Sequence, residues 1–282
     1  MRALLNAVCG KRGSANQELF IPKTVSRLNS GVPELSKLQA VILCGGLGTR
    51  LRSRIEGIPK CLAPIVDRPF LEYLVDLLVS AGLRRIIFCT GYGADKVWKT
   101  MGDGLRFEAE FLYSQEQASL GTAGALKLAE PLIDSETFFL VNGDSLFDMD
   151  HEWLMRKHRE RGALATMALA QVEDSTRYGN VELGPGGEVA TLREKPESTT
   201  SRRKSGWIYG GVCVADRNLL KTIPSSSEPV SLEREIFPGL IGCGLFGERF
   251  DGFFLDIGVP LDYERACQLI PARYSFARTH SS

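Results

Sequence analysis

The sequence has few histidines and none of the residue pairs that signal a zinc site. Only three of its 282 residues are histidine, and neither His-Glu-x-x-His nor Cys-x-x-Cys occurs. A metal centre built on histidine is therefore disfavoured. The seven cysteines are odd in number and widely spaced, which favours buried thiols in the reducing cytosol over disulfides or zinc ligation.

The sequence also lacks an excess of charge of either sign and any long hydrophobic run. Lys+Arg and Asp+Glu balance at 34 each, so no overall charge recruits nucleic acid or an anionic membrane surface. No apolar run approaches the roughly 18 residues of a membrane span, and residues 3–8 are too short for a secretory signal. We expect a soluble, cytoplasmic protein that binds neither nucleic acid nor membrane and whose anion sites are local.

The first 37 residues differ in character from the rest of the chain. They carry six Lys/Arg against two Asp/Glu and show no sustained periodicity. We expect a flexible N-terminal extension over 1–37, one domain over 38–270 and a C-terminal tail over 271–282. A start site placed too far upstream, or a tail that docks on a partner subunit of a homo-oligomer, are alternatives that the sequence leaves open.

From Leu38 onward, short β-rich runs alternate with helical patterns. Strands are predicted over 38–44, 85–90, 107–113, 137–142 and 164–170, and helices near 69–81, 122–130 and 151–161. This alternation predicts an α/β fold, a Rossmann-like three-layer α/β/α arrangement around a mostly parallel mixed sheet. Beyond about residue 170 a hairpin with its turn at 184–187 and further strands predict an added β-rich part, which extends the sheet or forms a lid.

A glycine-rich loop, CGGLGTRL, follows the first predicted strand directly. Ligand sites in α/β sheets lie at the carboxyl ends of the strands, and three glycines followed by threonine and arginine predict a phosphate site. The loop is not a P-loop, because no Gly-x-x-x-x-Gly-Lys-Ser/Thr occurs. It is not a dinucleotide fingerprint either, because Leu51 stands where the third glycine would be. A structural turn with exposed arginines is the alternative.

Three charged residues further along the chain could serve the same phosphate. Lys60 lies between Pro59 and Pro64, which restrict the backbone around it, so its amine can return to the loop. Asp144 and Asp256 follow very apolar strands. A single aspartate in such a place is usually a helix cap, but two that face one phosphate loop suggest shared Mg²⁺ ligation.

Seven segments, taken in order, resemble the sugar-1-phosphate nucleotidyltransferase family. They are LCGGLGTRL, IPKCLAPI, SLGTAGAL, VNGDS, RYGNVEL, EKP and FFLDIGVPLDY. The resemblance spans about Leu38 to Leu269, and it implies the nucleotidyltransferase fold with an added sugar-binding part. ILCGGLGTRL, NGDSLFD, IYGGV and FFLDIGVPLDY look most like the D-glycero-D-manno-heptose 1-phosphate guanylyltransferases. Mannose-1-phosphate guanylyltransferases, or another member of the family, are the alternative.

The resemblance also implies a reaction and residue roles. A nucleoside monophosphate passes from the triphosphate to a sugar 1-phosphate, with pyrophosphate as the second product and Mg²⁺ as cofactor. Arg50 and Lys60 are implied to be catalytic, and Asp144 and Asp256 to bind the metal. The implied nucleotide-binding residues are Leu43, Gly45, Gly46, Gly48, Thr49, Glu116, Gly121 and Thr122. The implied sugar-phosphate-binding residues are Gly179, Glu194, Lys195, Tyr209 and Gly210.

Glu116 matches the position that reads the base, and its chemistry favours guanine. Guanine presents adjacent N1–H and N2–H₂ donors, which one carboxylate can accept together, whereas uracil and thymine present one N–H between two carbonyls. We therefore expect GTP as the nucleotide. Tyr209 stands where the family often has asparagine, within the sugar-binding stretch, so the identity of the sugar stays open.

Two other classes of protein are alternatives to a nucleotidyltransferase. A non-catalytic regulatory subunit that senses a nucleotide-sugar could use the same fold, but it would be free to lose the charged residues, and all of them are present. A nicotinamide oxidoreductase is disfavoured by Leu51 in the glycine loop.

Overall fold

The computed structural model of the chain describes residues 34–46, 51, 57–175, 178–193 and 205–274. The strands in this part are β1 (Gln39–Leu43), β2 (Pro64–Ile65), β3 (Arg68–Pro69), β4 (Arg85–Thr90), β5 (Glu110–Gln115), β6 (Thr137–Asn142), β7 (Ser145–Asp148), β8 (Ala165–Val172), β9 (Asn180–Leu183), β10 (Val189–Arg193), β11 (Gly206–Asp216), β12 (Leu245–Phe250) and β13 (Phe253–Asp256). The α-helices are α1 (Phe70–Ser80), α2 (Ala94–Met101), α3 (Gly121–Leu128), α4 (His151–Arg161), α5 (Phe237–Gly239) and α6 (Pro260–Arg273).

A mixed central sheet of nine strands organises the described residues. Along its main path the order is β10-β9-β11-β6-β1-β4-β5, and β8 pairs with β11 and with β12. Strands β6, β1, β4 and β5 are parallel to one another, whereas β11 runs antiparallel to β6, β8 and β9. The predicted α/β architecture is confirmed, and the later strands extend the sheet.

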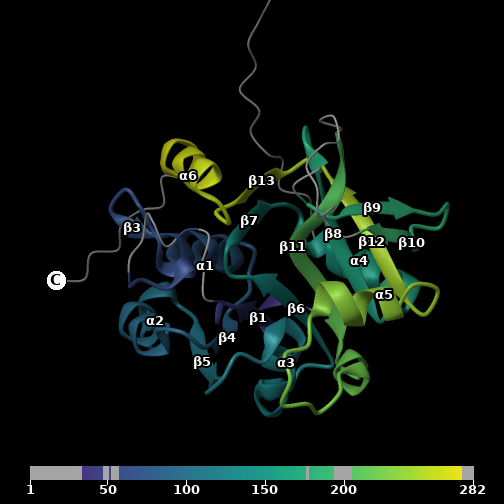
Figure 1. Cartoon of the computed structure of the whole chain (residues 1–282), viewed down its shortest axis with the longest axis horizontal. Helices are drawn as coiled ribbons and strands as arrows, with labels where there is room; N and C mark the ends of the chain where they lie inside the picture. The colour runs from purple at the N-terminus through teal and green to yellow at the C-terminus, as the bar shows by residue number, and fades with distance from the viewer. Residues whose placement is uncertain (1–33, 47–50, 52–56, 176–177, 194–204, 275–282) are drawn as a thin grey trace, which may run out of the picture. The chain divides into compact units, whose positions relative to one another are not determined.

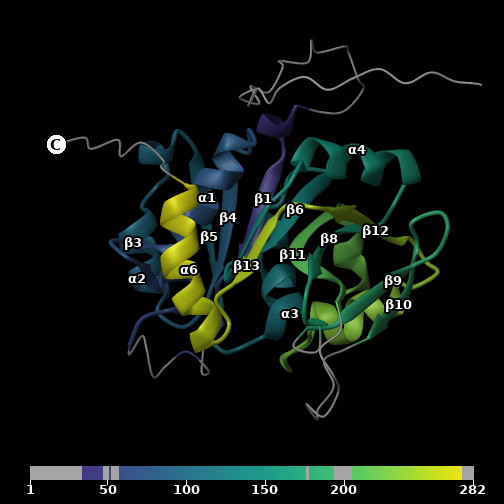
Figure 2. The same cartoon turned by 90° about the horizontal axis from the view of Figure 1, so that it is seen from above.

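Alternation along the strands creates a hydrophobic core on each face of this sheet. On β1, Ala40 and Ile42 belong to a core that includes residues of α1, α2 and α4. Val41 between them belongs to a second core, which includes residues of α3. Figure 2 shows α4 on one side of the sheet and α3 on the other. Successive side chains of a strand point to opposite faces, so a strand that is apolar throughout is buried on both.

A short two-stranded ribbon of β7 and β13 stands apart from the main sheet. The two strands are antiparallel, and they lie near α6 (Figure 1). Leu146 of β7 and Leu255 of β13 pack in a third core with residues of α1 and α6. Leu51, the residue that replaces the third glycine of a dinucleotide loop, is fully buried in this same core. Its role in the described structure is thus packing.

Most predicted elements occur at or near their expected places. The strands at 85–90 and 137–142 and the helix at 151–161 have the predicted bounds. The strand expected over 107–113 starts instead at Glu110, because a 3₁₀ turn occupies Leu105–Phe107. Helix α2 and strands β7 and β12 had not been predicted. Among the described residues, no helix has the length and apolar character needed to cross a membrane.

Candidate active site

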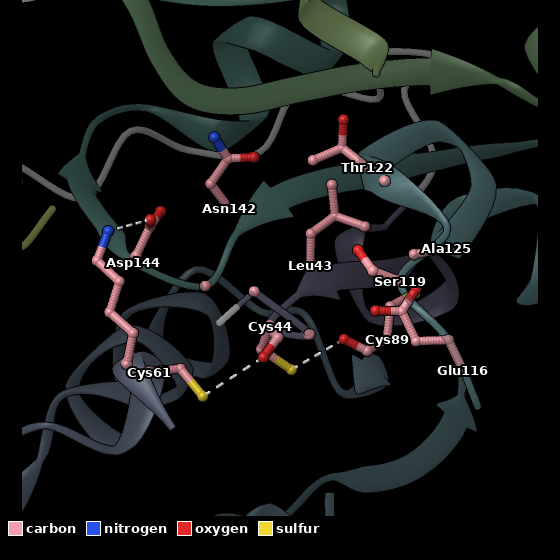
Figure 3. A pocket seen from close by; sticks show the side chains of 15 residues that line it. Leu43, Cys44, Cys61, Cys89, Glu116, Ser119, Thr122, Ala125, Asn142 and Asp144 are labelled. Atoms are coloured by element: carbon pink, nitrogen blue, oxygen red, sulfur yellow. Dashed lines mark hydrogen bonds and ion pairs between the residues drawn. The ribbon is translucent and has the colours of Figure 1, made fainter. Parts of the chain in front are cut away.

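A cavity of about 210 Å³ opens at the carboxyl ends of β1 and β6, beside the start of α3. The predicted residues that line it are Leu43, Gly45, Gly46, Lys60, Glu116, Gly121, Thr122 and Asp144. Glu116 and Asp144 lie at opposite ends of the view in Figure 3, with Leu43 and Cys44 between them. The structure therefore brings together the described residues that were predicted to bind the nucleotide.

Lys60 and Asp144 form an ion pair at one end of this cavity. Lys60 begins the 3₁₀ turn η2 (Lys60–Leu62) directly after Pro59, and Asp144 occupies the turn between β6 and β7. The Lys60 Nζ lies 2.5 Å from Asp144 Oδ2, and the two side chains are 15% and 35% exposed. The lysine amine is thus held in a shielded position where a bound phosphate could also contact it.

Asp256 reaches the same place through strand pairing. It ends β13, and the antiparallel register sets it opposite Ser145 of β7, the residue after Asp144. The Ser145 Oγ lies 3.3 Å from Asp256 Oδ2 and 3.4 Å from Asp144 Oδ1. Because a serine hydroxyl has one proton, it can donate to only one of the two carboxylates at a time. Two aspartates that are 112 positions apart in the chain therefore share one hydroxyl.

The electrostatics of Asp256 reflect this crowding. Burial and the negative charge of Asp144 raise the pKa of Asp256 to about 6, against the opposing effects of Lys60 and of the Gly258 N–H. That N–H donates to Asp256 Oδ1 at 2.6 Å. A Cβ on Gly258 would lie 2.5 Å from Asp256 Oδ1 and 3.2 Å from Lys60 Nζ. A larger residue at this point would require the carboxylate or the lysine amine to shift.

The donor set around Asp144 and Asp256 fits magnesium. Within the described ranges no group of three or more His, Cys, Asp or Glu side chains could hold a metal, so a closed site made only of protein ligands is not formed there. Magnesium usually binds one or two carboxylates and completes its shell with substrate phosphates and water. Two adjacent carboxylates, one of which lines the 210 Å³ cavity, meet that requirement.

Glu116 lies close to the backbone of Gly45 at the other end of the cavity. Its Oε2 accepts a hydrogen bond from the Leu120 N–H at 3.0 Å. Its Oε1 is so close to the loop that a Cβ on Gly45 would lie 2.9 Å from it. Burial raises the pKa of Glu116 above its usual value, and the hydrogen bond from the Leu120 N–H offsets only part of that rise. Glu116 also lines a neighbouring cavity of about 310 Å³, together with Gly45 and Tyr92.

Gly121 and Thr122 line the cavity and also build the scaffold around it. Gly121 has a φ of +73°, and a Cβ there would lie 2.4 Å from the Val230 carbonyl oxygen. That oxygen accepts the Ala123 N–H at 2.9 Å, so one of the N–H groups expected to be free at the start of α3 is already bonded. The Thr122 Oγ1 donates to Glu233 Oε2 at 2.9 Å and accepts the Leu232 N–H at 2.8 Å.

A second cavity, of about 390 Å³, contains part of the predicted sugar site. Gly179, Tyr209 and Asp256 line it. Gly210 does not line this cavity. A Cβ on it would lie 2.4 Å from the Phe147 ring, so a larger residue would displace that ring. The predicted residues Gly48, Thr49, Arg50, Glu194 and Lys195 lie outside the described residues.

Several residues that line these cavities have no role assigned from the sequence, among them Asn142, Ser145 and Glu233. Asn142, the last residue of β6, lines both the 210 Å³ and the 390 Å³ cavities. Ser145 lines the second cavity and contacts both aspartates. Both belong to the segment VNGDS, and that could have indicated them. Glu233 also lines the second cavity, and it belongs to none of the segments that carried the resemblance.

Comparison with known proteins defines the class. Residues 39–269 match the nucleotidyl transferase family, so the chain belongs to this family. The predicted resemblance and the predicted class of enzyme, a nucleotidyltransferase, are thereby confirmed.

Individual relatives narrow the comparison further. The chain is 35% identical over 231 residues to a D-glycero-alpha-D-manno-heptose 1-phosphate guanylyltransferase of Campylobacter jejuni, which covers 80% of this chain and 97% of that protein. It is also 35% identical over 232 residues to a mannose-1-phosphate guanylyltransferase catalytic subunit beta of Xenopus tropicalis. That match covers 80% of this chain and 62% of the relative, so the chain spans about three-fifths of the length of this mannose-1-phosphate guanylyltransferase subunit.

A solved structure shows the same fold. The crystal structure of HddC from Yersinia pseudotuberculosis complexed with GMP-PN is 29% identical to the chain. The two superpose with a TM-score of 0.71 over 82% of this chain and 98% of that one. The similarity covers the mixed sheet and its helices, in agreement with the family assignment.

Proposed function

We propose that this protein is a sugar-1-phosphate guanylyltransferase. It transfers GMP from GTP to a sugar 1-phosphate and releases pyrophosphate. The observation that carries the proposal is the position of the Lys60, Asp144 and Asp256 cluster where two cavities meet. Asp144 lines the first cavity, Asp256 lines the second, and Asn142 lines both. A nucleotide in the first cavity and a sugar phosphate in the second would present their phosphates to each other at this cluster.

The reaction needs charge neutralisation more than proton transfer. A sugar 1-phosphate is already an anion at neutral pH, so one of its oxygens can attack the α-phosphorus of GTP without a general base. A new P–O bond forms as the bond between the α-phosphorus and the bridging oxygen breaks, and pyrophosphate leaves with that electron pair. Lys60 would stabilise the negative charge of the transition state. Arg50 is proposed to stabilise the departing phosphates from the glycine loop.

Asp144 and Asp256 would hold Mg²⁺ in this scheme. When bound, the ion neutralises phosphate charge and polarises the reacting phosphoryl group. The protein contributes the two carboxylates, the shared Ser145 hydroxyl and the fixed separation that the β7–β13 pairing sets.

Guanine is the base that fits Glu116. The carboxylate lies at the opposite end of the view from Asp144 (Figure 3), as the base of a nucleotide must when its phosphates lie near Lys60. One oxygen already accepts the Leu120 N–H, which holds the carboxylate in place. The adjacent N1–H and N2–H₂ donors of guanine would complete its hydrogen bonds. GMP-PN, the ligand of the related HddC structure, supports this assignment.

The favoured acceptor is D-glycero-D-manno-heptose 1-phosphate, and mannose 1-phosphate is the alternative. The heptose 1-phosphate guanylyltransferase is matched over 97% of its length, whereas the mannose-1-phosphate guanylyltransferase subunit is matched over 62%. The cytoplasm is the proposed location, because the six described cysteines are free thiols and four of them are buried.

A substrate matrix tests this function. Purified protein with Mg²⁺ is incubated with GTP, UTP, dTTP, CTP or ATP against heptose, mannose and glucose 1-phosphates, and pyrophosphate release is followed. We expect release with GTP and with heptose or mannose 1-phosphate, and no release when Mg²⁺ is chelated. Binding of a GDP-sugar without any pyrophosphate release would support the non-catalytic regulatory subunit instead.

A further inference from the structure

A π-helical turn forms one wall of the second cavity. This turn, η7 (Leu232–Ile236), follows the extended residue Ser231 and leads directly into α5. Turns of this kind are rare and occur frequently at functional sites. The turn contains two glutamates with different surroundings. Glu233 lines the second cavity, whereas Glu235 is exposed and its Oε1 accepts the Ser231 N–H at 2.8 Å.

The carboxylate of Glu233 is fixed through one oxygen only. Its Oε2 accepts hydrogen bonds from Thr122 Oγ1 at 2.9 Å and from Ser231 Oγ at 3.1 Å. Its Oε1 accepts no hydrogen bond from any of the described residues. Two hydroxyls thus orient this half-buried carboxylate, and its second oxygen can accept a hydrogen bond from a ligand.

The surroundings of Glu233 suit a ring that carries hydroxyl groups. Aromatic side chains supply much of the apolar lining: Tyr209 packs edge-on against Phe237, and Tyr178 packs edge-on against Phe254. Burial first, and then the proximity of Cys213 and Glu233, raise the pKa of Tyr209, so its phenol stays protonated. Cavities with apolar walls and a few oriented polar groups are typical of small-molecule sites.

The negative charge also determines which part of the ligand can lie there. Arg193 and Arg234 also line the cavity, but a phosphate in direct contact with the Glu233 carboxylate would be repelled, so the part of a sugar phosphate that contacts Glu233 must be an uncharged donor. In a sugar 1-phosphate that donor is a ring hydroxyl. The phosphate would then lie near Asp256, where the neighbouring Lys60 amine offsets the carboxylate charge.

We propose that Glu233 accepts a hydrogen bond from a ring hydroxyl of the sugar 1-phosphate and thereby selects the sugar. This inference rests on the proposed function and adds a specificity residue to it. Thr122 and Ser231 act as positioning residues, because they orient the carboxylate without contacting the sugar themselves.

The test compares Glu233→Gln with Glu235→Gln, which makes the same charge change in the same turn outside the cavity. The substrates are GTP with mannose 1-phosphate, D-glycero-D-manno-heptose 1-phosphate and the four monodeoxy analogues of mannose 1-phosphate. We expect Glu233→Gln to raise the KM for the sugar phosphate about 10- to 100-fold, the range for loss of a hydrogen bond to a charged group. The KM for GTP should stay within about twofold. Glu235→Gln should change both KM values less than about twofold.

The deoxy analogues identify the hydroxyl. With the wild-type protein, the KM of one analogue should exceed the KM of mannose 1-phosphate by about the same factor by which Glu233→Gln raises the KM of mannose 1-phosphate. With Glu233→Gln, that analogue and mannose 1-phosphate should have nearly the same KM. An unchanged KM for the sugar phosphate in Glu233→Gln would overturn the inference while leaving the transferase function intact. An equal rise in KM for that analogue, relative to mannose 1-phosphate, on both proteins would do the same. If wild-type protein releases no pyrophosphate with any sugar 1-phosphate, the proposed function fails and the inference fails with it.

A second variant separates specificity from folding. Glutamine keeps an oxygen that can accept from Thr122 and Ser231, so thermal unfolding of Glu233→Gln should match wild type. If it does not, Glu233→Asp keeps the charge and withdraws the carboxylate by one methylene, and it should show the same rise in sugar KM with an unchanged KM for GTP. A rise in both KM values together would contradict a specificity role.

Discussion

Replacing Lys60 by methionine tests the charge cluster between the two cavities. Methionine nearly keeps the length of the lysine side chain and removes its charge. The change deletes an amine that lies 2.5 Å from Asp144 Oδ2 and is 15% exposed. It leaves Asp144 and Asp256 on either side of one serine hydroxyl with their mutual repulsion no longer offset by the lysine.

The expected losses in activity and in stability differ in size. Deletion of a donor that stabilises transition-state charge typically lowers kcat about 10²- to 10³-fold, or about 3 to 4 kcal/mol. The ion pair itself should contribute about 1 to 2 kcal/mol to the free energy of unfolding, because Asp144 is 35% exposed and solvent screens part of the attraction. For a chain of this size, each kcal/mol of lost stability lowers the Tm by roughly 2 to 4 °C.

Two assays and two further variants separate these effects. Pyrophosphate release gives kcat, and thermal unfolding gives Tm. The double variant of Lys60→Met with Asp144→Asn should recover part of the lost Tm and none of the activity, because it removes the unpaired carboxylate charge. Lys99→Met is the control, since Lys99 is 73% exposed and lies on α2. A kcat for Lys60→Met within tenfold of wild type would refute the catalytic role.

Further substitutions test the base, the start of α3 and a buried histidine. Glu116→Gln should lower the kcat/KM preference for GTP over UTP about tenfold or more, the loss expected for a charge-assisted hydrogen bond, and an unchanged preference would contradict base recognition. Gly121→Ala should lower the Tm clearly more than Gly102→Ala, because both glycines have positive φ but only Gly121 would bring its Cβ to 2.4 Å from a carbonyl oxygen. Burial lowers the pKa of His158 from 6.5 to about 4. The unfolded chain therefore binds this proton first, and stability should fall as pH drops from about 6.5 to 4, by up to about 3 kcal/mol. His158→Gln should flatten the dependence of the free energy of unfolding on pH in this range, as measured by urea titrations. An unaltered slope would contradict the role of His158.

Local patterns were sufficient to predict the elements that depend on local chemistry. Helix α4 has the predicted bounds because Asp150 caps its start, where Oδ1 accepts the Trp153 N–H at 2.8 Å, and Gly162 ends it in the left-handed conformation. Both signals are present in the sequence as Asp-His-Glu-Trp and Arg-Gly. Strand β4 is an apolar run bounded by charged residues and a glycine, and its bounds were predicted for the same reason.

The pairing of distant segments was harder to predict. The contact between Asp144 and Asp256 depends on the antiparallel register of β7 with β13. Strand β7 is only four residues long and follows a single turn after β6, so no periodicity separates it from its surroundings. The apolar strands before them and the family resemblance both indicated the two aspartates, but the Ser145 hydroxyl between them follows only from the register.

Glu233 could not be predicted for a related reason. Its position depends on a π-helical turn that packs on the first turn of α3, through the Leu232 N–H bond to Thr122 Oγ1. The sequence SLEREIF carries no glycine or proline that would indicate this geometry. The wall of the second cavity thus comes from tertiary contacts between segments more than 100 residues apart.

Transfer of a guanylyl group to a sugar 1-phosphate at the Lys60, Asp144 and Asp256 cluster can be measured directly. It is tested most directly by incubating the purified protein with Mg²⁺, GTP and D-glycero-D-manno-heptose 1-phosphate or mannose 1-phosphate, with Asp144→Asn and Asp256→Asn in parallel. We expect equimolar pyrophosphate and GDP-sugar from wild type, and a loss of rate of at least about 100-fold in both variants. Wild type that forms no GDP-sugar, or variants that form it at the wild-type rate, would contradict guanylyl transfer at this cluster.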